Sequence, residues 1–427
     1  MKFSPSVRPT GRPTAFLLTM LLLVSLLLPG CGLGPSAADP PQQEPSSTVK
    51  KNGGVTREEE FRGVWVSYME MNTLLSGQSP DGAKAAINQL MDDCVSYHLN
   101  AVVLHVRANS DAYYQSSLFP AAAAAAPLLE QGFDPLAYAV EAAHARGIEL
   151  HAWLNPYRVG TDPENKRCDD VFLCGDRTYY IPSSTAAQKL ILDGVREIVR
   201  NYAVDGVQYD DYFYPPGGVP DDNPADFEAE DFARSGMSDI GQWRRTHVSA
   251  LVRATSVAVH EREGCVFGVS PAATIDHDIQ KLYADVREWT RTAGYLDYIC
   301  PQIYYGFKNG ANPFDQALDQ WLSLPRADSV KVYVGLALYK AALADDAYAG
   351  DGRQDWAQNS DILKRAALLT REAGCGMILY SYSYFDPAGR GELSGDALAT
   401  AQQEVENLLP VLRDGGLSAT ETTAAAE

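Results

Sequence analysis

Short apolar segments with strand character alternate along the chain with amphipathic segments of helical period. In residues 81–97, apolar side chains such as Ile87 and Leu90 recur at a spacing that places them on one face of a helix. Asp134 stands directly before a proline and is expected to cap another helix, which ends before Gly147. Eight strand–helix units are predicted in this way, and no two strands follow one another directly.

This alternation predicts an α/β fold with a parallel sheet and helical crossovers. Eight units over about 350 residues are typical of a (β/α)8 TIM-like barrel with enlarged βα loops. A doubly wound open sheet is the alternative, but no Gly-rich phosphate loop follows the first predicted strand. The predicted strands are residues 61–67, 100–107, 148–155, 205–210, 265–270, 296–304, 330–336 and 375–382, and the predicted helices are residues 81–97, 135–146, 185–202, 240–261, 279–293, 314–322, 361–373 and 397–408.

The N-terminal residues have the pattern of an export signal. Basic residues precede an apolar run over residues 16–28, which is too short for a comfortable membrane span. The sequence Leu-Pro-Gly-Cys that ends at Cys31 resembles a bacterial lipobox, and an ordinary signal peptide with an incidental cysteine is the alternative. We therefore predict an exported lipoprotein, anchored to the membrane of the cell envelope through Cys31. Its predicted parts are a signal peptide (1–30), a flexible tether (31–57), a barrel domain (58–412) and a disordered tail (413–427).

Composition narrows the possible partners. The formal net charge of −20 argues against nucleic-acid binding, which requires a basic face. Tyrosines (23) outnumber phenylalanines (13), and tyrosine offers both a stacking face and a hydrogen bond, as sugar sites require. No cysteine or histidine spacing typical of a zinc site occurs, and no metal or cofactor is expected. Cys168 and Cys174 lie close together in one predicted loop and could form a disulfide in an oxidising compartment.

Polar residues collect where the predicted strands end, which is where barrels of this class place their active sites. Successive side chains of a strand point to opposite faces, so Gln208 and Asp210 share one face, and Asp211 begins the next loop. Similar positions on the other strands are occupied by His105, Arg107, His151, Trp153, Asn155, Gln302 and Tyr304.

Carboxylates beside aromatic side chains suit glycoside hydrolysis. One carboxylate attacks the anomeric carbon or activates water, and a second protonates the leaving oxygen. The Gly-x-Ser-x-Gly motif of α/β-hydrolase esterases is absent. The candidate catalytic residues are Asp210, Asp211 and Asp276, and the candidate substrate-binding residues are His105, Arg107, Trp153, Asn155, Tyr157, Gln208, Tyr212, Gln302 and Tyr304.

Several segments resemble the bacterial family 10-like glycosyl hydrolases, a family distinct from the family 10 xylanases. They include FRGVWVSYMEMNTLL, NAVVLHVRANSDAYYQSSLFP, DGVQYDDYFYP and LDYICPQIYYGF, and Asp-Asp-Tyr-Phe-Tyr-Pro is the most specific part. The resemblance implies a TIM-like barrel, a glycosidase, and peptidoglycan glycan strands stripped of peptide stems as substrate. It places the family's strand-four aspartate at Asp210. The family often has Ser-Pro-Phe-Gly after strand five, whereas this chain has Ser-Pro-Ala-Ala from Ser270 to Ala273, so it departs from the family on that loop.

Two other functions fit parts of the same pattern. His105, His151, His277 and Asp210 could together ligate a metal ion, as in a metal-dependent deacetylase or amidase acting on cell-wall material. A barrel that only binds glycan would keep the aromatic residues but would not need the two adjacent aspartates.

Overall fold

The computed structural model describes residues 60–215, 218–345 and 347–414. The predicted signal peptide, Cys31 and the predicted tether lie outside the described residues, as does the predicted tail from residue 415 onward. Among the helices that are described, none combines the length and the apolar character needed to cross a bilayer.

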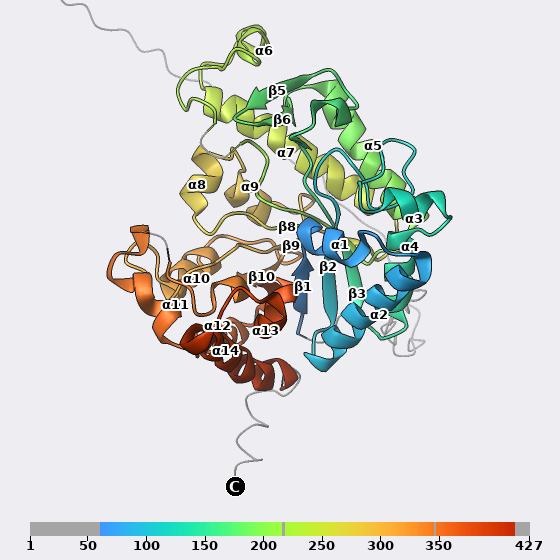
Figure 1. Ribbon diagram of the computed structural model, residues 1–427. Coiled ribbons are helices and arrows are strands. Elements are labelled where there is room, and N and C mark those ends of the chain that lie inside the picture. The colour runs from blue at the N-terminus through green and yellow to red at the C-terminus, as the bar shows by residue number, and fades with distance from the viewer. Residues whose placement is uncertain (1–59, 216–217, 346, 415–427) are drawn as a thin grey trace, which may run out of the picture. The chain divides into compact units, whose positions relative to one another are not determined.

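Eight parallel strands close into a barrel, which confirms the predicted (β/α)8 class (Figure 1). The barrel order is β1-β11-β10-β9-β8-β7-β3-β2, so each barrel strand lies beside the next barrel strand along the chain, and the last, β11, closes the barrel against β1. The strands are β1 (Arg62–Val66), β2 (Ala101–Arg107), β3 (Glu149–Leu154), β7 (Gly206–Tyr209), β8 (Val266–Val269), β9 (Tyr298–Ile299), β10 (Lys331–Leu336) and β11 (Gly376–Tyr380).

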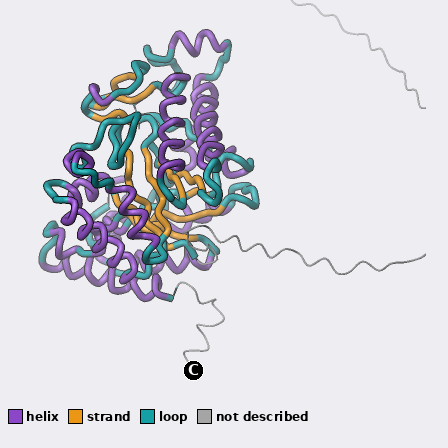
Figure 2. The backbone as a smooth tube through the Cα atoms, turned by 90° about the vertical axis from the view of Figure 1, so that its right-hand side faces the viewer, coloured by secondary structure: helices purple, strands orange, loops and turns teal. Residues whose placement is uncertain are grey.

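Helices surround these strands, as the tube view shows (Figure 2). The longer helices are α2 (Pro80–Ser96), α4 (Pro135–His144), α5 (Thr185–Asn201), α7 (Ile240–Val259), α10 (Phe314–Leu322), α12 (Ile362–Glu372) and α14 (Gly395–Arg413). The shorter ones are α1 (Tyr68–Leu75), α3 (Ala126–Glu130), α6 (Ala229–Ser235), α8 (Ile275–Gln280), α9 (Val286–Arg291), α11 (Asp355–Gln358) and α13 (Pro387–Arg390), with 3₁₀ turns η1 (Pro163–Asn165), η2 (Leu338–Lys340), η3 (Ala347–Gln354) and η4 (Tyr382–Phe385).

Local capping explains where helices begin. The Asp134 carboxylate accepts the backbone N–H groups of Leu136 and Ala137, so α4 starts as its sequence predicts. The predicted helix 279–293 is wrong, because α8 ends at Gln280 and the Asp285 side chain caps α9 as a new helix. Helix α14 extends to Arg413, one residue beyond the predicted boundary of the barrel domain.

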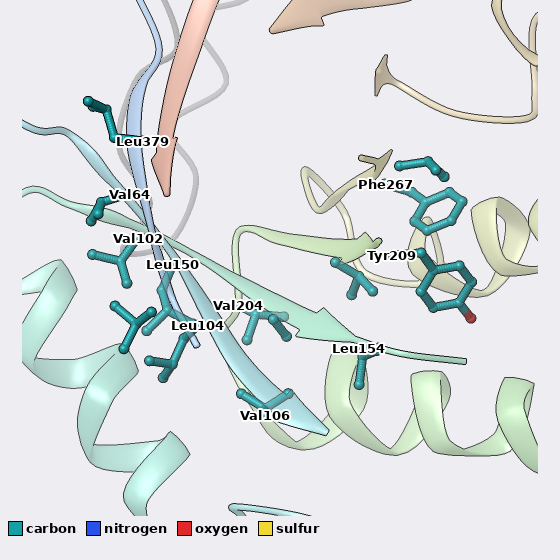
Figure 3. Close-up of a cluster of buried hydrophobic side chains, with 14 of the residues drawn as sticks. Val64, Val102, Leu104, Val106, Leu150, Leu154, Val204, Tyr209, Phe267 and Leu379 are labelled. Carbon is teal, nitrogen blue, oxygen red and sulfur yellow. The ribbon is translucent and has the colours of Figure 1, made fainter. Parts of the chain in front are cut away.

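Large aromatic rings fill the inside of the barrel, and the glycines opposite them leave the room that these rings occupy. A Cβ on Gly206 would lie 2.6 Å from the His151 ring, and one on Gly268 would lie 2.1 Å from the Tyr298 ring. The barrel interior therefore alternates between positions without a side chain and positions with a bulky one, which is how a small barrel fills its lumen. Outside the strands, a separate apolar layer packs against the helices; Figure 3 shows part of it, including Val102, Leu104 and Val106 of β2.

The enlarged loop after β3 contains a second sheet that the sequence pattern did not predict. Strands β4 (Arg158–Gly160), β6 (Arg177–Tyr180) and β5 (Val171–Cys174) form it in the order β4-β6-β5, and all pairings are antiparallel. Cys168 and Cys174 are both free thiols in this region, so the disulfide that their proximity in sequence suggested is not formed.

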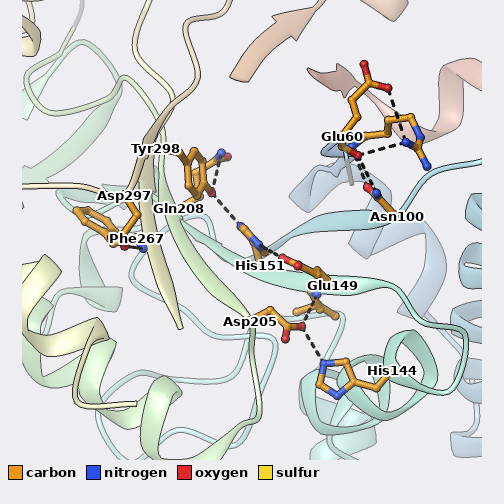
Figure 4. Close-up of polar contacts among 12 residues, drawn as sticks. Glu60, Asn100, His144, Glu149, His151, Asp205, Gln208, Phe267, Asp297 and Tyr298 are labelled. Carbon is orange, nitrogen blue, oxygen red and sulfur yellow. Dashed lines mark hydrogen bonds and ion pairs between the residues drawn. The ribbon is translucent and has the colours of Figure 1, made fainter. Parts of the chain in front are cut away.

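At the N-terminal end of the barrel, two aspartates that precede strands connect neighbouring segments by hydrogen bonds (Figure 4). Asp205, just before β7, accepts the Leu150 N–H at 2.9 Å and contacts His144 Nε2 at 2.8 Å. Asp297, just before β9, accepts the Phe267 N–H at 2.7 Å and contacts His260 Nε2 at 2.9 Å. Each carboxylate thus connects its own strand to the preceding strand of the barrel and to a histidine at the end of a helix.

Candidate active site

Asp210 lies at the C-terminal mouth of the barrel, directly after β7. A Cβ added to Gly206 would point into the barrel lumen, and the Gln208 side chain does so. Strand alternation therefore directs the Asp210 side chain inward as well. Its side chain is 3 % exposed, and its Oδ1 accepts the Tyr212 N–H at 3.1 Å. Burial raises the pKa of Asp210, and the negative charge of Asp211 raises it further.

Asp211 is the partner of Asp210 in a coupled pair. Burial also raises the pKa of Asp211, against the opposing effects of the Gln302 amide and the Arg158 guanidinium. Two adjacent carboxyls of this kind titrate as a unit, because ionising one makes ionisation of the other more costly. The pair therefore retains a proton to higher pH than exposed aspartates do, which supplies an acid and a carboxylate at one place.

Arg158, on β4, is the cation of the site. Its Nε donates to the Ala108 carbonyl at 2.8 Å, and its guanidinium lies 5.6 Å from the Tyr68 ring and 5.4 Å from the Tyr212 ring. Its charge lowers the pKa of both aspartates of the pair. Arg158 was not among the predicted site residues. It follows the end of β3 in a loop, where strand alternation no longer indicates the direction of a side chain.

His105, Trp153 and Asn155 form one wall of the mouth. The rings of His105 and Trp153 stack with centroids 3.7 Å apart, and the Trp153 indole N–H faces Asp210. Burial holds the pKa of His105 well below its usual value, so the imidazole is neutral. Its Nδ1 accepts the Tyr68 N–H at 3.3 Å, which assigns the proton to Nε2. His105 Nε2 and Asn155 Oδ1 are buried close to one another, since Asn155 opposes the lowering of the His105 pKa, but neither atom makes a hydrogen bond of good geometry among the described residues.

The opposite wall is aromatic. Tyr304 lies 6.0 Å from Tyr380 and 5.7 Å from Tyr339, measured between ring centroids. Burial raises the pKa of Tyr380 to about 12, the charges of Glu70 and Asp210 contribute, and its ring lies 6.5 Å from the Trp153 ring between centroids. Tyr212 lies beside the aspartate pair, since the charges of both aspartates raise its pKa. Gln302 Nε2 donates to the Ser270 carbonyl at 3.1 Å and lies next to Asp211.

Asp278, rather than the predicted Asp276, is the carboxylate of the following loop that approaches the pair. Asp276 is exposed and forms a surface ion pair with Arg287 at 3.2 Å. Asp278 is fully buried, its Oδ1 accepts the Ala272 N–H at 2.9 Å, and its Oδ2 makes no hydrogen bond among the described residues. Burial raises the pKa of Asp278 well above its usual value, and the nearby charge of Asp211 contributes. Both residues lie on α8, and side chains two apart on a helix point in different directions.

Three predicted substrate-binding residues are placed elsewhere. A register shift between His105 and Arg107 interrupts the alternation of β2, and the Arg107 guanidinium packs outside the barrel, 4.3 Å from the Phe119 ring. Tyr157 is fully buried in the apolar layer under the helices. Gln208 is inside the barrel, but its amide already accepts from Trp65 Nε1 at 2.6 Å and donates to the Tyr298 hydroxyl at 3.3 Å.

The residues of the metal-site hypothesis are not brought together. His151 lies deeper in the barrel, with Nδ1 3.0 Å from the Tyr298 hydroxyl and Nε2 3.3 Å from Glu149 (Figure 4). His277 is exposed on α8. Within residues 60–215, 218–345 and 347–414, no group of three or more His, Cys, Asp or Glu side chains has an arrangement suited to a metal ion.

Comparison with known proteins identifies the family of this chain. The model of the family described as glycosyl hydrolase-like 10 matches residues 60–349. The glycosyl hydrolase YngK of Bacillus subtilis is 32% identical over 66% of this chain and 61% of its own length, so the chain spans about three fifths of that relative. The glycosyl hydrolase DigH of Escherichia coli K12 is 30% identical over 75% of this chain and 82% of its own length.

A solved structure has the same fold as this chain. The glycoside hydrolase domain of PgaB (BpsB) from Bordetella bronchiseptica superimposes with a TM-score of 0.54, covering 84% of this chain and 99% of that chain. The two sequences are 14% identical, so this likeness concerns the architecture of the barrel.

Proposed function

This chain belongs to the glycosyl hydrolase-like 10 family, and on that premise we propose that it hydrolyses glycosidic bonds in a cell-envelope polysaccharide, namely the glycan strands of peptidoglycan. The observation that carries the proposal is the pair formed by Asp210, which is buried, and Asp211, which is half-buried, at the C-terminal mouth of the barrel, where the pKa of each carboxyl is raised. Such a pair keeps a proton in the neutral range, as an acid catalyst requires, while its second carboxyl is ionised.

The pair divides the reaction between its two carboxyls. The protonated carboxyl donates its proton to the glycosidic oxygen as the bond to the anomeric carbon breaks. The ionised carboxyl either attacks that carbon or removes a proton from the attacking water. Arg158, near both groups, keeps one of them ionised, since its charge lowers the pKa of each.

The walls of the mouth suit a sugar. Tyr304 and Tyr380 would offer aromatic surface to the apolar side of a pyranose, and the carboxyls of Asp210 and Asp211 would accept hydrogen bonds from its hydroxyl groups. A site of this kind recognises sugars through aromatic rings and hydrogen bonds, so it needs no basic surface, and the net charge of −20 is compatible with a polysaccharide substrate.

The envelope location is part of the same proposal. The lipobox-like sequence that ends at Cys31 supports export and a lipid anchor, which would bring the barrel to the polysaccharides of the cell envelope. Metabolic labelling with a clickable fatty acid tests the anchor. Wild-type chain should be labelled and Cys31→Ser should not, whereas labelling of both would place the lipid elsewhere.

Turnover of purified, peptide-free peptidoglycan glycan strands tests the activity. Wild-type protein should release oligosaccharides, Asp210→Asn should release none, and the surface variant Asp276→Asn should match the wild type. The same activity should survive treatment with a chelator. Activity lost to chelation would favour a metal-dependent enzyme, and binding of the glycan without products from the folded wild type would indicate a non-catalytic binding barrel.

A further inference from the structure

A pocket lies between the loops that follow β10 and β11, beside the candidate active site. It is open to solvent on one side and is lined by residues of both loops and of α14. Tyr339, from the turn directly after β10, and Tyr384, from the turn directly after β11, both line it. Because both strands are parallel members of the barrel, the pocket opens at the same C-terminal end as the aspartate pair.

A row of rings joins this pocket to the wall of the mouth. The Tyr384 ring lies 6.1 Å from the Tyr339 ring, which lies 5.8 Å from the Tyr380 ring, both measured between centroids. The Tyr380 ring in turn lies 6.5 Å from the ring of Trp153, which belongs to the wall of the mouth. Neighbouring rings of this row meet edge to face, at interplanar angles of 61° and 89°, so a chain of sugars that extends from the mouth towards the pocket meets a series of separate aromatic contacts.

The lining of the pocket divides into an apolar part and a polar edge. Leu343 and Leu393 contribute to the apolar part together with alanines of the neighbouring turn and of α14. At the edge, Arg390 pairs with Glu392 at 2.7 Å, and its guanidinium lies 3.7 Å from the Tyr384 ring. Because this cation already has an anion as its partner, the pocket favours a neutral ligand over a charged one.

We propose that the pocket is a subsite for an N-acylated sugar residue that lies further along the same glycan chain than the residue held at Asp210. The ring faces of Tyr339 and Tyr384 would contact the apolar side of the pyranose, and Leu343 and Leu393 would contact the methyl group of its acyl substituent. The Arg390–Glu392 pair would meet the hydroxyl groups at the edge. This inference rests on the proposed function, since it extends the substrate held at the aspartate pair.

The experiment compares glycan fractions of increasing length. Asp210→Asn protein, which binds without cleaving, is titrated calorimetrically with short and long oligosaccharides from peptide-free peptidoglycan. Affinity should rise once the chain is long enough to reach the pocket. Adding Leu343→Asp to this protein should reduce that gain about tenfold, equivalent to about 1.4 kcal/mol, because a charge replaces the apolar contact.

Leu368→Asp is the matched control. Leu343 and Leu368 are exposed to nearly the same extent, 40% and 38%, but Leu368 lies on α12 and does not line the pocket. It should retain the full gain with chain length. Tyr384→Ala should also lose the gain, and Tyr384→Phe, which keeps the ring face, should restore it. Chemically de-N-acetylated strands of the same length should show a smaller gain than the intact ones.

The outcomes separate the subsite from the proposed function. If the wild type cleaves the glycan, but affinity rises equally with chain length in the Leu343→Asp and Leu368→Asp proteins, the subsite is overturned and the proposed function stands. An equal gain for de-N-acetylated strands would overturn its acyl specificity. No cleavage by the wild type and no binding by Asp210→Asn at any length would overturn the proposed function and the subsite together.

Discussion

The two ends of the barrel treat buried polar groups in opposite ways. At the N-terminal end, the buried Asp205 and the partly exposed Asp297 each accept a backbone N–H from the neighbouring strand and each contact a histidine. At the C-terminal mouth, His105 Nε2, Asn155 Oδ1 and Asp278 Oδ2 are buried, yet make no hydrogen bond among the described residues. A buried polar atom without a partner destabilises a fold, so we interpret the first end as built for stability and the second for a ligand.

The pKa values follow the same division. At Asp205, burial raises the pKa, but the His144 and Leu150 hydrogen bonds outweigh it and hold the pKa below its usual value. At Asp210, burial and the charge of Asp211 prevail and raise it. Aspartates at opposite ends of one strand thus favour opposite protonation states. Four predictions, from the largest expected effect to the smallest, test this contrast.

The largest effect is expected at the mouth. Asp210→Asn should lower the rate of glycan hydrolysis by about a thousandfold or more, because an amide can neither donate the acid proton nor act as the anion. Circular dichroism should show an unchanged fold. Asp276→Asn serves as the control because Asp276 lies in a surface ion pair with Arg287. Activity retained in Asp210→Asn would remove this residue from the chemistry.

The second effect is expected at the N-terminal end and concerns stability. Asp205→Ala should lower the free energy of unfolding by about 2–4 kcal/mol, because the buried Leu150 N–H and His144 lose their acceptor. Urea unfolding measures this, and Asp81→Ala, at a side chain that is 96% exposed, should change little. Activity per folded molecule should remain at the wild-type level, and a loss of turnover in folded Asp205→Ala would contradict the division between the two ends.

The pH dependence of that loss has a definite sign. A carboxyl whose pKa is lower in the folded chain contributes stability above its unfolded pKa of about 3.9, and this contribution disappears as the pH falls through the folded value. The difference in unfolding free energy between wild type and Asp205→Ala should therefore be constant near neutral pH and shrink in acid. A difference that stays constant down to pH values well below 3.9 would contradict the lowered pKa.

The third effect concerns the cation of the mouth. Arg158→Gln should raise the pKa values of Asp210 and Asp211, because the guanidinium lowers both. The acidic limb of the pH–rate profile should move to higher pH, with a loss of about tenfold in rate on that limb. Arg177→Gln, on β6 with a half-exposed side chain, is the control. An unmoved acidic limb would show that Arg158 does not act on the aspartate pair.

The smallest effect is again at the mouth but concerns stability. A carboxyl whose pKa is raised in the folded chain opposes folding as the pH rises from about 3.9 towards the raised value. Asp210→Asn should therefore increase the free energy of unfolding at neutral pH by about 1 kcal/mol or more, and the increase should vanish in acid. Asp205→Ala has the opposite sign, so the two variants measured side by side test the contrast directly. A destabilised Asp210→Asn would contradict it.

The barrel itself could be predicted from the sequence because its signals are local. Period-two and helical patterns, together with caps such as Asp134, depend on residues a few positions apart. Strand alternation also indicates the face on which His105, Trp153 and Asp210 lie, since each belongs to a regular strand or follows one directly, and their catalytic and binding roles stay predictions. The antiparallel sheet β4-β6-β5 escaped prediction, because its short strands lie in a loop without a clear period.

The rest of the site depended on tertiary structure, for a physical reason in each case. A register shift in β2 turns the Arg107 side chain to the outer face of the barrel. This shift appears only in the pairing of β2 with β3, which the sequence does not show. The short helix α8 buries Asp278 and exposes Asp276, although both lie in one acidic cluster of the sequence. Arg158 reaches the aspartate pair from a loop whose path is set by distant contacts. The sequence alone therefore determined the barrel and the position of Asp210, whereas the charges around Asp210 were decided by packing between segments far apart in the chain.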